Sequence, residues 1–155
     1  SALRWAGGAL QVTLDERCAP LPRGLRGRLL LRPQAPGAAA PLALDAAGRH
    51  QWWPIAPCAR IEVDLAEPGW RWQGPAYLDS NRGSEPLAHG FRSWQWARAA
   101  LPGGGSAVVY DALAADGGAR RLALQFGNRA ALTIGARGLA LRQVRDAGFL
   151  TSMAC

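Results

Sequence analysis

The feature that most constrains this fold is a series of short runs in which apolar and polar residues alternate. In the run LQVTL, Leu10, Val12 and Leu14 fall on one side of an extended chain, because side chains alternate across a strand. Asp116-Gly117, between two such runs, favours a tight hairpin. The runs that predict strands are residues 10–14, 28–31, 60–65, 107–113, 121–126, 130–134 and 139–144. The chain is therefore expected to be all-β.

Regular spacing of short strands, with glycine and proline between them, is typical of an antiparallel sandwich or barrel. The chain has 155 residues, the length of one ordinary domain, so residues 1–155 are expected to form a single β domain. No helix longer than two turns is predicted. Residues 139–147 are the one helical candidate, and they fit a strand equally well. Residues 33–41, with glycine and alanine between prolines, are expected to form a flexible loop.

The charge balance indicates which partners are compatible with this chain. The formal net charge is +7, and all 18 basic residues are arginine. This fits either a GC-rich genome or attraction to an anionic partner such as an acidic membrane leaflet. The sequence has no basic block interleaved with aromatics, which argues against nucleic acid. Cys18, Cys58 and Cys155 are widely spaced and lack a CxxC pair, so they predict neither a metal site nor a disulfide framework.

Tryptophan is the most informative residue type in the composition. The seven tryptophans include three close pairs: Trp52 with Trp53, Trp70 with Trp72, and Trp94 with Trp96. Indoles two residues apart point to the same side of a strand. Two such strands would place four indoles in one cavity. The alternative for any single tryptophan is that it fills the core.

Tyr77 and Asp79 lie between the later tryptophan pairs and would share one side of a strand. An aspartate beside indoles loses hydration, which favours the protonated, proton-donating form of its carboxyl group. The alternative is that Asp79 builds a turn with Ser80 and Asn81.

His50 precedes Trp52 by two residues and would share its side of the strand. A lone histidine is more often structural than catalytic. His50 and His89 are the only histidines, and no carboxylates stand near them at ligand spacing, so no metal site is predicted.

The segment at residues 74–98 resembles a signature of the carotenoid 1,2-hydratases, also called hydroxyneurosporene synthases. That signature has the form G-x-x-Y-x-D-x-N-x-G-x-E-P-L followed by F-x-x-W-x-W-x-R. The matching positions here are Gly74, Tyr77, Asp79, Asn81, Gly83, Glu85, Pro86, Leu87, Phe91, Trp94, Trp96 and Arg98. Residues 103–117 resemble the next strand and hairpin of the family, and His50-Gln51-Trp52 fits its H-x-W element.

This resemblance implies a lipocalin-like antiparallel β fold without a cofactor. It implies addition of water across the terminal 1,2 double bond of an acyclic carotenoid such as neurosporene or lycopene. It places Asp79, His50, Tyr77 and Trp52 in the active site. We expect the remaining aromatic residues of the region to bind the hydrocarbon substrate: Trp70, Trp72, Phe91, Trp94 and Trp96. Family chains are longer at the N-terminal side, so this chain is expected either to stand alone or to follow a further β domain.

The expected mechanism begins with protonation of the alkene by Asp79. Tyr77 would orient that acid or bind water, His50 would tune its proton or accept one, and Trp52 would face the cation. The substrate is insoluble in water, so we expect the protein in the cytoplasm, peripherally bound to the inner or intracytoplasmic membrane. The alternatives are a lipocalin-like carrier of an apolar ligand, a related polyene or polyketide isomerase or cyclase, and a purely structural β domain.

Overall fold

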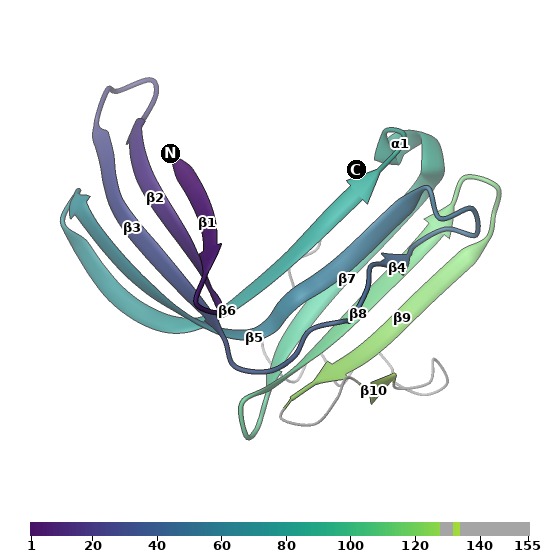
Figure 1. Cartoon of the computed structure of the whole chain (residues 1–155). Coiled ribbons are helices and arrows are strands. Elements are labelled where there is room, and N and C mark those ends of the chain that lie inside the picture. Colours follow the sequence, from purple (N-terminus) through teal and green to yellow (C-terminus); the bar gives the residue numbers. More distant parts are fainter. Residues whose placement is uncertain (128–131, 134–155) are drawn as a thin grey trace. The chain divides into compact units, whose positions relative to one another are not determined.

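The computed structural model describes residues 1–127 and 132–133. Every strand pair whose register is known is antiparallel, and within the described residues the only helix is the four-residue α1 (Leu87–Gly90). The strands are β1 (Ala2–Ala6), β2 (Ala9–Arg17), β3 (Gly24–Pro33), β4 (Leu42–Ala43), β5 (His50–Glu67), β6 (Trp70–Gly83), β7 (Phe91–Leu101), β8 (Gly105–Ala114), β9 (Ala119–Phe126) and β10 (Leu132–Thr133) (Figure 1). The all-β, antiparallel fold is confirmed, and its lipocalin-like character stays a prediction.

The strands form two sheets. One has the order β1-β2-β3-β5-β4, with β6 also paired to β5, and the other has the order β10-β9-β8-β7. The described residues also divide into two compact units. The N-terminal unit comprises Ser1–Gln34 and Cys58–Tyr77, and the C-terminal unit comprises Ala35–Pro57 and the described residues from Leu78 onward. The long strands β5 and β6 thus contribute to both units. That residues 1–155 form one domain stays a prediction.

The N-terminal unit is a curved sheet in which β1, β2 and β3 lie side by side (Figure 1). Val12 lies opposite Leu29, and Leu29 lies opposite Val63. Paired residues point to the same side of a sheet, so these side chains form one apolar face, as the alternation predicts. Val63 is buried.

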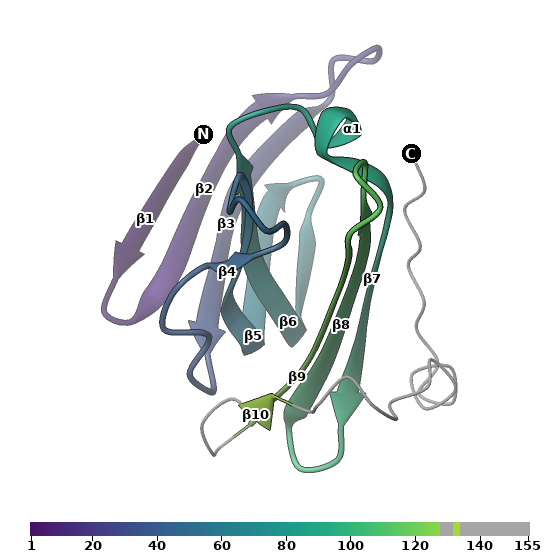
Figure 2. The ribbon, with the colours of Figure 1, turned by 90° about the vertical axis from the view of Figure 1, so that its right-hand side faces the viewer.

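The C-terminal unit contains the twisted sheet of β7, β8 and β9 (Figure 2). Ala97, Ala99, Val109 and Ala123 form a buried cluster on one face of this sheet. The opposite face carries Tyr110 between its cross-strand partners Trp96 and Leu122. The central strand β8 therefore buries side chains on both faces, which explains its almost continuous apolar sequence.

Five of the predicted strands are confirmed: residues 10–14 lie in β2, 28–31 in β3, 60–65 in β5, 107–113 in β8 and 121–126 in β9. The hairpin at Asp116-Gly117 is also confirmed. Gly117 has φ 90°, and the Asp116 carboxylate accepts a hydrogen bond from the Gly118 amide at 2.8 Å. The strand predicted at 130–134 coincides with the described β10 only at residues 132–133, and the strand at 139–144 and the helix candidate at 139–147 lie outside the described residues.

Strand β5 begins at His50, well before the strand predicted at residues 60–65. Its first half is not predicted because Pro54 and Pro57 interrupt the alternating pattern. Proline lacks an N–H and argues against a central strand. Here the β4 ladder reaches only Gln51 and Trp52, and the carbonyl of Pro54 accepts a hydrogen bond from Ala38 at 3.0 Å. The loop expected at 33–41 is thus present and is hydrogen-bonded to β5. In the described part of the chain, no helix has the length and apolar character needed to cross a membrane.

Candidate active site

The centre of the candidate site is a hydrogen bond between two strands of the C-terminal unit. Trp52, on β5, is completely buried, and its indole Nε1–H donates to Oδ2 of Asp79, on β6, at 2.8 Å. Asp79 is half-buried. An indole N–H is a donor only, so this contact fixes one carboxylate oxygen and the direction of the carboxyl plane. The interpretation that Asp79 only builds a turn is wrong, because it lies within a strand and contacts a distant tryptophan.

Tyr110, on β8, is the site residue that the sequence did not reveal. Its ring centroid lies 5.5 Å from that of Trp52, with the ring planes tilted by 43°. Burial, and secondly the negative charge of Asp79, raise the pKa of Tyr110 to about 12. Its hydroxyl therefore stays protonated at every pH at which the protein would work. In the sequence, Tyr110 is simply a tyrosine inside an apolar predicted strand, a pattern that is typical of a core residue.

Three of the predicted substrate-binding aromatics belong to this unit. Trp96 lies opposite Tyr110 in the β7–β8 ladder, and Trp94 lies two residues away on the same face, opposite Ala112. Both indoles are half-buried. Phe91 is buried and meets the His50 imidazole edge-on, with centroids 4.9 Å apart. The structure thus places Trp94 and Trp96 on the same sheet face as the Tyr110 ring.

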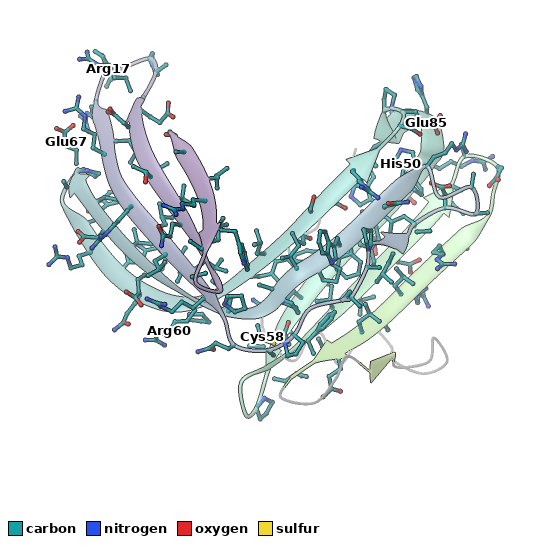
Figure 3. All side chains as sticks on the ribbon, in the orientation of Figure 1. Arg17, His50, Cys58, Arg60, Glu67 and Glu85 are labelled. Atoms are coloured by element: carbon teal, nitrogen blue, oxygen red, sulfur yellow. The ribbon has the colours of Figure 1, made fainter. Side chains whose placement is uncertain are left out.

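His50 lies at the start of β5 and is 2% exposed. Its Nδ1 is 3.1 Å from Oδ2 of Asp45, and its Nε2 is 3.2 Å from the carbonyl oxygen of Glu85. The labelled side chains of His50 and Glu85 lie near each other at the α1 end of this unit (Figure 3). The imidazole therefore joins three segments: the turn before β5, the start of β5 and the turn after β6.

The Asp45 carboxylate organises the turn that leads into β5. Oδ1 accepts the amides of Ala47 at 2.9 Å and Arg49 at 3.1 Å, and Oδ2 accepts the amide of His50 at 2.7 Å. Burial by itself would raise the pKa of Asp45. The hydrogen bonds from the His50 and Arg49 amides, the His50 ring and the Ala47 amide outweigh burial, and the net pKa is lowered.

Two glycines, of which Gly83 belongs to the signature, pack so closely on the imidazole that no larger residue fits. A Cβ at Gly83 would lie 2.8 Å from Cδ2 of His50, and a Cβ at Gly90 would lie 2.5 Å from Cε1. Both distances are shorter than carbon atoms tolerate without displacement. Gly83 ends β6 and Gly90 ends α1, so the ends of both elements pack directly on the ring.

Trp70, Trp72 and Tyr77 belong to the N-terminal unit. Trp70 is 61% exposed and Trp72 is 52% exposed, whereas Tyr77 is half-buried. Trp72 borders a surface pocket with a volume of about 670 Å³. Charged side chains of both signs line that surface: Arg28, Arg32, Glu62, Asp64 and Arg71. The participation of these three aromatic residues in the site stays a prediction.

A metal site does not emerge from the described part of the chain, where no three histidine, cysteine, aspartate or glutamate residues are grouped to hold an ion. The arrangement offers one half-buried carboxyl group, an indole N–H that donates to it and the Tyr110 ring in contact with that indole. These groups suit proton transfer beside an apolar or cationic centre.

A sequence profile of the carotenoid hydratase CrtC family matches residues 1–143. The chain belongs to this family. The acyclic carotenoid 1,2-hydratase of Thiocapsa roseopersicina is 48% identical over 126 residues, which are 81% of this chain and 31% of the relative. The enzyme of the same name from Rubrivivax gelatinosus is 46% identical over the same shares. The one from Cereibacter sphaeroides is 39% identical over 80% of this chain and 44% of the relative.

The carotenoid hydratase chain described here therefore spans about a third of the length of the first two relatives and less than half of the third. No solved structure matches it significantly. Family membership is confirmed. The hydratase signature has a physical basis in this structure: Asp79 contacts Trp52, while Gly83 and the Glu85 carbonyl contact His50.

Proposed function

We propose that this chain carries the catalytic site of an acyclic carotenoid 1,2-hydratase, a hydro-lyase that needs no cofactor. Membership of the carotenoid hydratase family supports the reaction class. The observation that supports the site is the hydrogen bond from Trp52 to the half-buried Asp79. It holds a carboxyl group in a fixed direction within an aromatic environment, which suits an acid that must protonate a hydrocarbon.

In the proposed reaction, the Asp79 carboxyl group gives its proton to C2 of the terminal double bond. A C–H bond forms at C2 while the π bond breaks, which leaves a tertiary cation at C1. A water molecule adds to C1, and its extra proton returns to the Asp79 carboxylate. Atoms and charge balance without another acid, base or oxidant. The Trp52 N–H donates to Oδ2 throughout and holds the carboxyl group in one direction while it gives and regains the proton.

Aromatic faces near Asp79 would stabilise the cation. A desolvated aromatic ring contributes about 0.5 to 2 kcal/mol to a neighbouring cation. Trp52 and Tyr110 are in ring contact, and Trp94 and Trp96 share the Tyr110 face of the β7–β8 ladder. We assign Trp94, Trp96 and Phe91 to the hydrocarbon chain. That Trp70 and Trp72 bind the hydrocarbon, and that Tyr77 orients the acid or binds water, stays a prediction.

We further propose that the protein acts in the cytoplasm while bound peripherally to the inner or intracytoplasmic membrane, where the substrate dissolves. Large apolar side chains are exposed in the N-terminal unit, including Leu3 at 73%, Trp70 at 61% and Trp72 at 52%. Tryptophan favours the membrane interface. The net charge of +7 adds attraction to anionic lipid, at about 1 kcal/mol for each arginine near the surface. A further N-terminal β domain in the complete protein fits the greater length of the relatives.

The test is conversion of lycopene by the full chain in heavy water, with lycopene supplied in vesicles. Hydration predicts a 1-hydroxy product with one carbon-bound deuterium at C2. Unchanged lycopene that stays bound to the protein would instead support the carrier alternative. A cyclised or isomerised product without added oxygen would support the isomerase or cyclase alternative. Either result contradicts the proposed function.

A further inference from the structure

The imidazole of His50 is fully engaged by acceptor groups. A carbonyl oxygen can only accept a hydrogen bond, so the contact between Nε2 and the Glu85 carbonyl at 3.2 Å requires a hydrogen on Nε2. The other ring nitrogen, Nδ1, lies 3.1 Å from Oδ2 of Asp45. Both ring nitrogens are therefore occupied by partners within the protein, so neither is available to take a proton from water while these contacts are made.

Packing also holds the ring in place. The side chain of His50 is 3% exposed and that of Asp45 is 6% exposed. Gly83 and Gly90 pack on ring carbons Cδ2 and Cε1, with no space for a methyl group at either position. Phe91 meets the ring edge-on. These contacts prevent the imidazole from turning toward a substrate.

The ring belongs to or contacts segments that lie close in the chain to both partners of the central hydrogen bond. Trp52 is two residues after His50 on β5, and Asp79 is four residues before Gly83 on β6. The imidazole thus ties the start of β5 to the end of β6. An ion pair between Arg49 and Glu85, with Nη1 and Oε1 3.3 Å apart, joins the same two turns. Displacement of the ring would shift Trp52 relative to Asp79.

We propose that Asp45 and His50 form a positioning clamp that sets the hydrogen bond between Trp52 and Asp79, and that His50 takes no proton during the reaction. The assignment to hydration rests on the proposed function above, whereas the clamp itself rests on the contacts. Asp45 thereby becomes a positioning residue that neither the signature nor the sequence pattern indicated. The segments joined are the turn at 45–49, the start of β5 and the turn at 83–90.

The first test replaces His50 with amides in the full chain. In His50→Asn the side-chain N–H₂ can donate to Asp45 in place of Nδ1, and in His50→Gln it can donate to the Glu85 carbonyl as Nε2 does. Neither amide titrates. The clamp predicts that at least one variant hydrates lycopene within about tenfold of the wild-type rate, because one hydrogen bond is kept. It also predicts an unchanged shape of the rate profile against pH.

Loss of a general base costs about 10²- to 10⁴-fold in rate. A loss of that size in both amide variants, with folding intact, would overturn the proposal. His89→Gln is the matched control, because His89 is exposed on α1 and is the only other histidine. It should retain the wild-type rate and the wild-type profile.

The second test does not depend on activity. Gly90→Ala pushes a methyl group against Cε1 of His50 and leaves every titratable group in the chain. The clamp predicts that this variant shifts the nuclear magnetic resonance signal of the Trp52 indole N–H, which is assigned by its loss in Trp52→Phe. An unshifted signal in folded Gly90→Ala overturns the clamp. If wild-type protein hydrates no carotenoid, the proposed function fails, and the indole signal still decides whether the clamp exists.

Discussion

The indole Nε1–H of Trp52 donates a hydrogen bond of 2.8 Å to Oδ2 of Asp79, across two strands and 27 residues of sequence. Trp52 is completely buried, whereas Asp79 is only half-buried. The donor is therefore held rigidly by the core, and it fixes the direction of a carboxyl group that is partly exposed. This combination suits a proton donor whose direction must be fixed for the reaction.

Trp52→Phe should keep an aromatic ring in the core but remove the N–H donor. A hydrogen bond to a charged group contributes about 1.5 to 3 kcal/mol, so the rate of lycopene hydration should fall by roughly ten- to a hundredfold. Trp53→Phe is the control, because Trp53 donates to the Ala38 carbonyl at 2.8 Å instead. Steady-state rates of the two folded variants make the comparison. Equal rates would show that the bond to Asp79 has no catalytic role.

Tyr110→Phe should change the behaviour of the protein at high pH. The pKa of Tyr110 is raised to about 12 in the folded protein, against about 10 in an unfolded chain. Its contribution to stability is then complete below about pH 10 and is lost as the pH rises toward the folded value. The free energy of unfolding of Tyr110→Phe should fall less between these limits than that of wild type. An equal decline in Tyr110→Phe and in wild type would contradict the raised pKa of Tyr110.

Asp45→Asn should weaken the protein at neutral pH. The pKa of Asp45 is lowered in the folded state, so its stabilising contribution is present above the unfolded value of about 3.9 and is lost as the pH falls through the folded value. The substitution should lower the free energy of unfolding by about 1 to 3 kcal/mol near neutral pH, because buried hydrogen bonds lose a charged acceptor.

As the pH falls, the free energy of unfolding should also decline less in Asp45→Asn than in the wild type. Denaturant titrations across the acid range measure both effects. Asp116→Asn is the control, since Asp116 accepts one amide in an exposed hairpin. If both substitutions cost the same, Asp45 does not organise the turn before β5.

Replacement of Trp70 and Trp72 by serine should weaken binding to lipid. Both indoles are more than half exposed, and interfacial tryptophans favour the boundary between lipid and water. Sedimentation with anionic vesicles should show reduced binding of the double variant, and wild type should bind neutral vesicles less strongly than anionic ones. Trp53→Ser, at a less exposed indole of the C-terminal unit, provides the comparison. Equal wild-type binding to neutral and anionic vesicles would count against the role of arginine.

Much of the strand pattern could be predicted from sequence, because alternation follows directly from strand geometry. Leu10, Val12 and Leu14 share a face as expected. The first half of β5 could not be predicted, because its prolines are tolerated only where the short β4 ladder ends. That His50 and Trp52 are both buried while Gln51 and Trp53 are more exposed follows from the same alternation.

The contacts of the candidate site were less accessible to sequence reasoning. Asp79 was identified from its neighbours and from the family signature, but its bond to Trp52 depends on the pairing of β5 with β6. Tyr110 reads as an ordinary core residue of β8, and only tertiary packing brings it against Trp52. Asp45 stands in a turn whose sequence suggests nothing more than a bend. Its role depends on the burial of His50 five residues later.

The most direct test of the account is the rate of lycopene hydration by Asp79→Asn in the full chain, with Asp111→Asn as control. Asp111 pairs with the exposed Arg121 on the sheet face opposite Tyr110, so its substitution should leave the rate unchanged. An asparagine at position 79 can still accept the Trp52 N–H, but it has no proton to give. We predict that folded Asp79→Asn loses at least about 10²-fold in rate. Near wild-type production of the 1-hydroxy carotenoid by this variant would contradict the assignment of Asp79 as the acid.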